Sequence, residues 1–370
     1  MKILEFFGEP LSFGGQESFI INMYDNFVKN ENYTFLTPFN NNNYYLKTKL
    51  RNNDRCISQN YKFESRLRKF YILKTGLRCI NSQYDVIHIH SGSVFTLLLI
   101  AAVAKRRGVK KIIVHSHATG YSTITHKIIK TISDKLLSKY VDYYLACSKE
   151  AGEYKFPASV ISNHNKFEII MNGINVEKYI FSETYRKAKR AELKLKDEFV
   201  ICHVGRYSPE KNHIFIIQVL EEYLKLDKNV VLLLIGGEGS SSQEIENIIN
   251  EKGLSSNIIM LKERTDINEL LSAADIFIFP SLFEGLGISA IEAQASGLIT
   301  ICSDNVPDQT NVSHMFHHLP LEDGAQKWAE YIFKNRDYSR DNVKQEIIDH
   351  GFSAQICAKR LEEIYLESSG

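Results

Sequence analysis

Two glutamates stand eight positions apart in a glycine-containing segment late in the chain. Glu284 is followed by Gly285 and Gly287, and Glu292 lies further along the same stretch. Glycines allow backbone amides to approach a ligand closely, and a helix N-terminus favours anionic oxygen. A carboxylate there would repel phosphate, so the glutamates are better suited to accept hydrogen bonds from hydroxyl groups. The segment therefore predicts a ligand that carries both phosphate and sugar.

Two cations in an earlier loop supply the charge that a phosphate needs. Arg206 and Lys211 lie in the segment Gly205-Arg-Tyr-Ser-Pro-Glu-Lys-Asn, directly after an apolar run. Arginine presents a planar fork of donors and lysine a compact charge, and the two together suit a diphosphate. Alone, they would be interpreted as surface cations. Together with the paired glutamates they favour a diphosphate site.

Two further loops contain adjacent glycines. Gly14 and Gly15 follow the first apolar run and predict a loop that a phosphate can approach. Gly236, Gly237 and Gly239 follow a later run, but they lack the Gly-x-Gly-x-x-Gly spacing of a dinucleotide fingerprint. We interpret the second loop as a tight strand-to-helix turn near the nucleotide, without redox chemistry.

Two His-x-His pairs, His88/His90 and His115/His117, end apolar runs of the first half. Alternation along a strand places both members of a pair on one face. We expect these histidines to donate hydrogen bonds at the edge of a cleft, with His117 best placed to act on a substrate at neutral pH. A metal site is the alternative, but the sequence singles out no third ligand and contains no Asp-x-Asp motif. We therefore expect no metal.

Short apolar runs alternate with longer amphipathic stretches along the chain. Runs of Val, Ile and Leu without alternation are typical of parallel strands covered by helices on both faces. The pattern predicts an α/β protein with two doubly wound, Rossmann-like parallel-sheet domains of six strands each, facing a central cleft at the carboxyl ends of the strands. The expected strands are residues 2–7, 34–37, 86–90, 111–115, 143–147, 168–171, 200–204, 230–235, 258–261, 276–279, 298–301 and 315–319.

The turn at Asn172-Gly173 follows the sixth expected strand and marks the domain boundary. We expect an N-terminal domain over residues 1–172 and a C-terminal domain over residues 173–351, with a final helix at about 352–370 that packs back on the first domain. The charged segment 183–198 would be a linker or the first helix of the second half. Residues 288–295 are expected to form a helix entered from a glycine turn.

Composition limits the class of protein. With 44% hydrophobic and 24% charged residues, the chain is typical of a globular protein, and a net charge of +1 predicts no nucleic-acid partner. Its six scattered cysteines form no Cys-x-x-Cys pair, which indicates reduced thiols in a cytoplasm. We expect no signal peptide, and the apolar stretch 94–104 is too short to span a membrane.

One segment departs from this even charge. Residues 45–78 hold ten lysines and arginines against two acidic residues, with aromatic and aliphatic residues between them. A basic amphipathic stretch of this kind suits peripheral contact with an anionic membrane surface. A solvated helix face is the alternative.

In number and order, these motifs resemble those of retaining GT-B glycosyltransferases of family 4, and in particular bacterial exopolysaccharide and capsule enzymes. The resemblance covers nearly the whole chain. It rests on Gly14-Gly15-x-Glu17, Val114-His115-Ser116-His117, Ala146-Cys147-Ser148, Met171-Asn172-Gly173-Ile174-Asn175, Gly205-Arg206, Lys211-Asn212, Pro280-Ser281 and Glu284-x7-Glu292.

The resemblance implies roles for individual residues. Arg206 and Lys211 would hold the donor pyrophosphate and stabilise the departing nucleoside diphosphate. Glu284 would bind the hydroxyls of the donor sugar and Glu292 those of the ribose. His117 would contact the donor sugar near its reacting face.

The same resemblance implies further contacts to the donor. The amides of Gly287 and Ile288 would bind sugar or phosphate, and the loop at Arg264 would lie near the base. Gly14 and Gly15 would approach the phosphate from the N-terminal, acceptor-binding domain, and Gly205 would lie beside the pyrophosphate. Such enzymes are thought to use a front-face route in which the leaving phosphate accepts the acceptor's proton, so neither a metal nor a separate general base is expected.

The expected function is transfer of a hexose or N-acetylhexosamine from a UDP-sugar to a glycan acceptor. The basic stretch suggests that this acceptor is lipid-linked and lies at the inner face of the plasma membrane. Two alternatives stay open, a UDP-sugar 2-epimerase of the same fold and a non-catalytic accessory subunit. The epimerase class lacks the pattern of cations and paired glutamates, and an accessory subunit would be expected to lose it.

Overall fold

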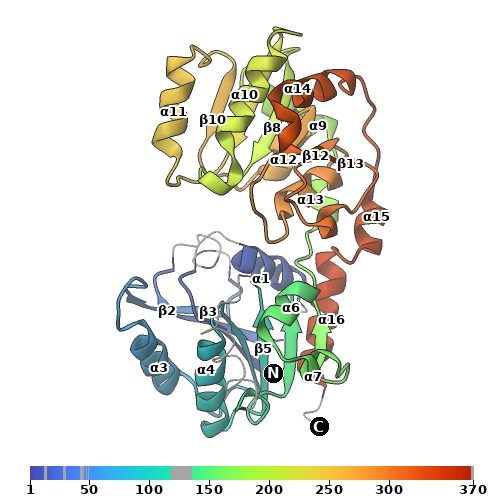
Figure 1. The fold of residues 1–370 in the computed structure, drawn as a ribbon. Helices are drawn as coiled ribbons and strands as arrows, with labels where there is room; N and C mark the ends of the chain where they lie inside the picture. Colours follow the sequence, from blue (N-terminus) through green and yellow to red (C-terminus); the bar gives the residue numbers. More distant parts are fainter. Residues whose placement is uncertain are drawn as a thin grey trace. The chain divides into compact units, whose positions relative to one another are not determined.

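The computed structural model describes residues 1–11, 15–27, 31–41, 46, 48, 50–117 and 136–367. These residues belong to two compact units, Met1–Ile174 together with Ala354–Gly370, and Asn175–Ser353. Each unit contains one parallel sheet covered by helices (Figure 1). The last helix, α16 (Ala354–Leu366), belongs to the first unit although it comes last in the sequence.

The first unit contains seven parallel strands in the order β3-β2-β1-β4-β5-β6-β7. Their bounds are Lys2–Phe7 (β1), Asn32–Phe39 (β2), Arg55–Tyr61 (β3), Val86–His90 (β4), Lys111–Ser116 (β5), Tyr143–Ala146 (β6) and Phe167–Ile169 (β7). The prediction of six strands is wrong for this unit, because it missed β3. This strand lies at the edge of the sheet, and its sequence Arg-Cys-Ile-Ser-Gln-Asn-Tyr contains no apolar run.

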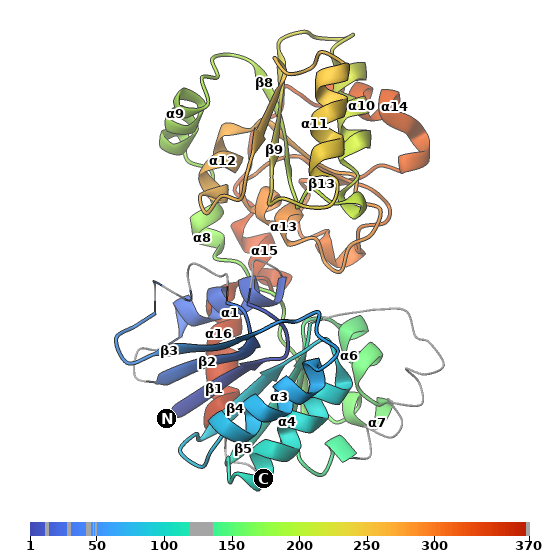
Figure 2. The same ribbon diagram turned by 90° about the vertical axis from the view of Figure 1, so that its left-hand side faces the viewer.

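Helices cover both faces of the first sheet (Figure 2). On one face, α1 (Gly15–Asn26) and α16 contribute Ile20, Met23 and Leu361 to a buried cluster with the strands. On the other face, α3 (Arg68–Cys79) and α4 (Val94–Arg106) contribute Ile72 and Leu97. The apolar stretch that begins at residue 94 is therefore a core helix, as expected. Shorter helices of this unit are α6 (Lys149–Lys155) and α7 (Ala158–Ile161).

The second unit contains six parallel strands in the order β10-β9-β8-β11-β12-β13. All six correspond to the strands predicted for this half of the chain. Their bounds are Phe199–Val204 (β8), Val230–Ile235 (β9), Ile258–Leu261 (β10), Ile276–Phe279 (β11), Thr300–Cys302 (β12) and Phe316–His318 (β13). The helices are α8 (Val176–Tyr179), α9 (Glu183–Glu192), α10 (His213–Tyr223), α11 (Ser242–Glu251), α12 (Ile267–Ala273), α13 (Ile288–Ala295), α14 (Gly324–Lys334) and α15 (Lys344–Asp349).

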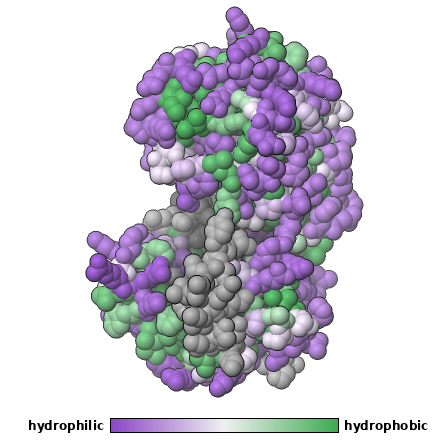
Figure 3. Space-filling model, in the orientation of Figure 1, coloured by the Kyte–Doolittle hydropathy of each residue, from purple (hydrophilic) through white to green (hydrophobic). Residues whose placement is uncertain are grey.

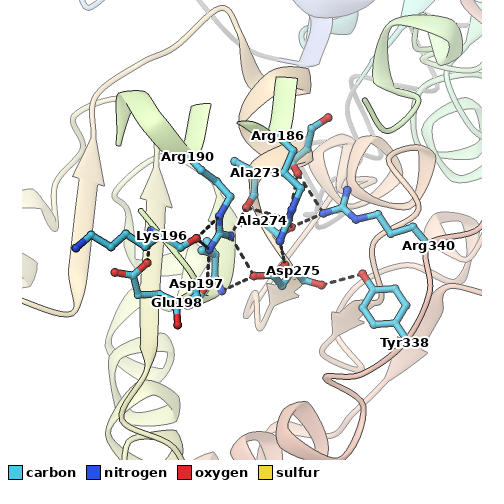
Figure 4. A network of polar contacts seen from close by, with 12 residues as sticks. Arg186, Arg190, Lys196, Asp197, Glu198, Ala273, Ala274, Asp275, Tyr338 and Arg340 are labelled. Carbon is cyan, nitrogen blue, oxygen red and sulfur yellow. Dashed lines mark hydrogen bonds and ion pairs between the residues drawn. The ribbon is translucent and has the colours of Figure 1, made fainter. Parts of the chain in front are cut away.

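The charged segment after residue 183 forms α9, which is tied to the sheet by an ionic network (Figure 4). Asp275 immediately precedes β11 and pairs with Arg186 at 2.6 Å and with Arg190 at 3.4 Å. Its Oδ2 also accepts a hydrogen bond of 2.8 Å from the amide of Val200, and Tyr338 donates to its carbonyl oxygen. The network therefore anchors the amino end of β11, whereas the residues with predicted chemistry follow its carboxyl end.

Candidate functional site

The loop that contains Arg206 and Lys211 (residues 205–212, the cation loop) and the loop that contains Glu284 (residues 280–287, the glutamate loop) follow neighbouring strands. Strands β8 and β11 pair directly, although they are not consecutive in the chain, and the strand order of the second sheet reverses between them. In open parallel sheets, ligands bind outside the carboxyl ends of the strands where the order reverses. Residues 205–212 and residues 280–287 leave the sheet at this point.

Two hydrogen bonds to backbone carbonyl oxygens join these two loops. The amide of Leu282 donates to the carbonyl oxygen of Glu210 at 2.8 Å. The side-chain amide of Asn212 donates to the carbonyl oxygen of Pro280 at 3.1 Å. These contacts hold the loops side by side, so the structure brings together the two motifs that the sequence predicted to share a ligand.

Lys211 and Glu284 form an ion pair between Nζ and Oε1. The two side chains are only 18% and 10% exposed, and the Lys211 ammonium also lies 4.9 Å from the ring centroid of Phe279. Sequence reasoning assigned a phosphate to one residue and hydroxyls to the other, and it did not predict that they pair. Each charge is compensated by the other, which keeps both in place at the carboxyl ends of the strands.

The backbone around Arg206 is tightly packed, while its side chain is exposed. Tyr207 donates its amide hydrogen to the carbonyl oxygen of Gly237 at 3.1 Å. At Gly205, a Cβ atom would lie 2.8 Å from Nε2 of His203, so a larger residue here would force that side chain to shift. The loop therefore carries an exposed arginine on a closely packed backbone.

The Gly236 turn supports this loop from the neighbouring strand β9. A Cβ atom on Gly236 would overlap the carbonyl oxygen of Gly205, and one on Gly239 would overlap that of Tyr207. Gly237, between them, has no atom within 4 Å of such a position. The segment is the tight turn into α11 that the sequence predicted, and two of its glycines are required by packing against the cation loop.

A glycine in a left-handed conformation begins helix α13. Gly287 has φ +79° and precedes Ile288, the first helical residue. A Cβ there would also lie 3.0 Å from the ring of Phe279, and Thr310 donates a hydrogen bond to the carbonyl oxygen of Leu286. The turn leaves the first amides of α13 available at a helix N-terminus, which suits an anionic group.

Glu292 lies one turn into α13 and bonds to a residue that sequence reasoning missed. The hydroxyl of Tyr179, on α8, donates to Glu292 Oε1 at 2.6 Å. Burial raises the pKa of Glu292 to about 7, against the opposing effects of this hydrogen bond and of Lys178. No local pattern reveals Tyr179, because it lies 113 residues earlier in the chain.

We expect the pKa of Glu292 to make stability depend on pH. The folded-state pKa of Glu292, about 7, lies above the ordinary value of 4.5. The contribution of this group to the free energy of unfolding is therefore fully present below pH 4.5, where the carboxyl group is protonated, and is lost as the pH rises through 7. Substituting Glu292→Gln removes this loss while keeping an acceptor for Tyr179. The substitution should raise the free energy of unfolding by about 2 kcal/mol more at pH 8 than at pH 5, measured by urea denaturation. An effect that is equal at both pH values would contradict this assignment.

Arg264 follows β10, where it was predicted to lie near the base of a nucleotide. Its guanidinium bonds to Asp266 at 2.7 and 2.6 Å and to Glu192 of α9 at 2.8 Å. The side chain therefore braces α9 against this loop. Its contact with a base stays a prediction.

The first unit contains the predicted histidines and the N-terminal glycines. Gly15 begins α1, whereas Gly14 lies outside the described residues. The His-x-His pairs do share one face of the sheet, but the predicted cleft edge is wrong for His88, His90 and His115, which are fully buried beneath the neighbouring helices.

Folding also supplies what the sequence could not single out, a third histidine, His115, beside the pair His88/His90. Ligand atoms of His88, His90 and His115 lie within 4.8 Å of one another. Each of the three makes a hydrogen bond to another histidine or to a neighbouring side chain, while Nε2 of His115 has no partner among the residues that the structure describes. The expected absence of a metal stays a prediction.

Comparison with known families agrees with this architecture. Residues 13–178 match the family described as Glycosyltransferase Family 4, and residues 185–332 match Glycosyl transferases group 1. The two matched regions correspond to the first and the second unit. The cation loop, which includes Tyr207, and the glutamate loop both lie in the group 1 region.

Relatives and solved structures extend over most of the chain. It is 27% identical to the putative glycosyltransferase EpsF of Bacillus subtilis, over 95% of this chain and 93% of EpsF. It is 26% identical to the UDP-Gal:alpha-D-GlcNAc-diphosphoundecaprenol alpha-1,3-galactosyltransferase of Escherichia coli, over 65% of this chain and 63% of that protein. The crystal structure of HepE from Anabaena in complex with UDP superposes with a TM-score of 0.74 at 17% identity, covering 98% of this chain and 99% of HepE.

The two parallel sheets, the paired loops at the reversal of strand order and the two family matches lead to one assignment. The chain belongs to the GT-B glycosyltransferases, with a family 4 N-terminal domain and a group 1 C-terminal domain, and it is a transferase enzyme.

Proposed function

We propose that this protein transfers a hexose or N-acetylhexosamine, with retention of configuration, from a UDP-sugar to a lipid-linked glycan in surface polysaccharide synthesis. The observation that carries the proposal is the pairing of the two loops at the strand reversal of the second sheet, with Lys211 and Glu284 in contact. A diphosphate and a sugar are the chemical groups that this combination of cation, amides and carboxylates suits.

Each group has a role in the proposed reaction. Lys211 and Arg206 bind the diphosphate and stabilise the negative charge that develops on it as the glycosidic bond breaks. Glu292 accepts hydrogen bonds from the ribose, and Glu284 accepts them from the sugar. In the front-face route, an oxygen of the departing diphosphate takes the proton from the attacking hydroxyl, so the protein supplies positioning and charge rather than a base.

The relatives support the choice of donor and acceptor. The Escherichia coli galactosyltransferase is named for a UDP-linked donor and a diphosphoundecaprenol-linked acceptor, and HepE was crystallised with UDP. For the present chain both assignments are proposals.

A direct test is incubation with UDP-galactose, UDP-glucose and UDP-N-acetylglucosamine, each with a polyprenyl-diphosphate-linked N-acetylglucosamine acceptor. We expect one donor to yield an extended acceptor by mass spectrometry, and calorimetry to show binding of UDP. Absence of both transfer and UDP binding would reject the proposal. Conversion of a UDP-sugar to its 2-epimer without an acceptor would instead identify an epimerase.

A basic and apolar surface around α3 supports contact with an anionic membrane. Leu67, Phe70 and Leu77 are 56%, 55% and 46% exposed. Figure 3 shows apolar side chains interspersed with polar ones in this region, which is at the lower left of the molecule. The exposed cations between residues 62 and 78 are Lys62, Arg66, Arg68, Lys69, Lys74 and Arg78, against the single carboxylate Glu64.

Cations beside exposed apolar side chains bind anionic lipid through charge and through insertion of the apolar groups. Among the described residues, no helix is long and apolar enough to cross a membrane. The contact that we propose is a peripheral one, through the surface around α3.

We expect Phe70→Ser to weaken binding to vesicles of phosphatidylglycerol and phosphatidylcholine about tenfold, because the inserted aromatic ring is lost. The measurement is co-sedimentation at fixed ionic strength. Leu226→Ser, at a position in the second unit that is 44% exposed, is the matched control and should bind as the wild type does. Equal binding by the Phe70 variant and the wild type would reject this surface.

A further inference from the structure

A buried carboxylate lies behind the histidines of the first unit. Glu5, on β1, is fully buried, and its Oε2 lies 2.8 Å from Nε2 of His90 on β4. Nδ1 of His90 lies 2.8 Å from Nε2 of His117, at the end of β5. The three side chains form a continuous chain of hydrogen bonds across three neighbouring strands.

The other oxygen of Glu5 is held by the C-terminal helix. Tyr365, on α16, donates its hydroxyl hydrogen to Glu5 Oε1 at 2.8 Å. Nδ1 of His88 lies 2.7 Å from the same hydroxyl oxygen. Both oxygens of Glu5 are therefore engaged, and the carboxylate has one fixed orientation toward His90.

The charge states of these groups determine where their protons are. Burial alone would raise the pKa of Glu5, but His88 and His90 outweigh it and lower that pKa to about 2, so the carboxylate only accepts hydrogen bonds. Burial lowers the pKa of His90 to about 4 and holds that of His117 well below its ordinary value. At neutral pH both imidazoles are neutral, and each carries one N–H.

The tautomers follow in order from Glu5. His90 must donate from Nε2, because the carboxylate cannot donate, and its Nδ1 is then an acceptor. His117 must therefore donate from Nε2 to His90. Its one lone pair is left on Nδ1, a buried atom without a hydrogen-bond partner among the residues that the structure describes.

We propose that Glu5 and His90 are positioning residues that hold His117 in the Nε2–H tautomer, so that its Nδ1 accepts a hydrogen bond from a hydroxyl group of the sugar substrate. The proposal rests on the proposed function for the identity of that substrate. It assigns the two residues a part in the reaction that is separate from the cations and glutamates of the second unit. A proton on Nδ1 of His117 would instead present a donor to that hydroxyl group, which would then have to rotate to accept the hydrogen bond.

The wild-type protein provides the first test, which needs no activity. Nitrogen-15 NMR of the histidine-labelled full chain distinguishes the two tautomers by their ring-nitrogen shifts. The signals of His117, one of twelve histidines, are assigned by their loss in the His117→Gln variant. We expect the Nε2–H tautomer at pH 7.5. An Nδ1–H tautomer or a charged ring would overturn the proposal, as would a bound metal ion that is lost on substitution of His90.

The substitution Glu5→Gln provides the second test. Tyr365 can still donate to the amide oxygen, so the amide nitrogen faces His90 and donates to it. His90 then donates from Nδ1 to His117, which is left with its proton on Nδ1. The NMR signals of His117 should change to those of the opposite tautomer, and kcat should fall about 10- to 100-fold while the KM for the UDP-sugar changes less than about twofold.

The matched control is Glu168→Gln, which makes the same change at another carboxylate of the first unit. Glu168 pairs with Arg360 and is not part of the chain of hydrogen bonds from Glu5 to His117. We expect it to leave the tautomer of His117 and kcat unchanged. If Glu5→Gln leaves the tautomer unchanged, or reduces kcat no more than this control does, the positioning role is rejected. If the tautomers are as expected but no UDP-sugar is used, the proposed function fails and the tautomer assignment stands.

Discussion

Replacing Lys211 with alanine is expected to lower kcat/KM for the UDP-sugar about a thousandfold, equivalent to about 4 kcal/mol of transition-state stabilisation. The ammonium group is held at the end of two neighbouring strands by Glu284 and Phe279, where solvent screens it only partly. In the proposed reaction it faces the oxygens on which negative charge develops. Its removal also leaves the carboxylate of Glu284 without its counter-ion beside an anionic ligand. The effect is measured by initial-rate kinetics with whichever of the three UDP-sugars proves to be the donor.

The control for Lys211→Ala is Lys225→Ala, which breaks a lysine–glutamate pair on the surface of the same unit. Lys225 pairs with Glu222 at 2.7 Å and is 67% exposed, so its loss should change kcat/KM less than about twofold. Glu284→Ala should also abolish most transfer, which separates a catalyst from an accessory subunit whose partner would stay active. Full activity of Lys211→Ala in a folded protein would remove this residue from the site.

The substitution Gly236→Ala is expected to lower the free energy of unfolding by about 3 kcal/mol and to abolish UDP binding. The new Cβ would overlap the carbonyl oxygen of Gly205 and lie 2.7 Å from its carbonyl carbon. Backbone cannot move aside as a flexible side chain can. The loop that carries Arg206 and Lys211 must therefore shift.

Gly237→Ala tests this prediction from the adjacent position. A Cβ there meets no atom within 4 Å, so the variant should bind UDP as the wild type does and lose little stability. Urea denaturation and calorimetry with UDP report the two effects separately. If the variants at residues 236 and 237 behave alike, close backbone packing is not the reason for glycine at this turn.

The order of local elements could be predicted where one segment contains its own signals. The apolar run before Pro280, the glycine turn and the helix Ile288–Ala295 occur as expected, because burial of a strand and the start of a helix depend on neighbouring residues. Strand β3 was missed for the opposite reason. Its half-exposed, polar sequence becomes a strand only because β2 offers it an edge to pair with.

The candidate site divides in the same way, between what local sequence signals predict and what depends on tertiary contacts. The sequence by itself determined which residues carry charge and which strands they follow, since these are properties of residue type and of short spacings. It also predicted that two of the motifs share a ligand. Only the tertiary structure decided that Lys211 pairs with Glu284, that Tyr179 bonds to Glu292, and that Glu5 orients the histidines. Those contacts join residues from distant parts of the chain, and the pKa values that follow from them depend on burial, which exists only once the sheets and helices have packed.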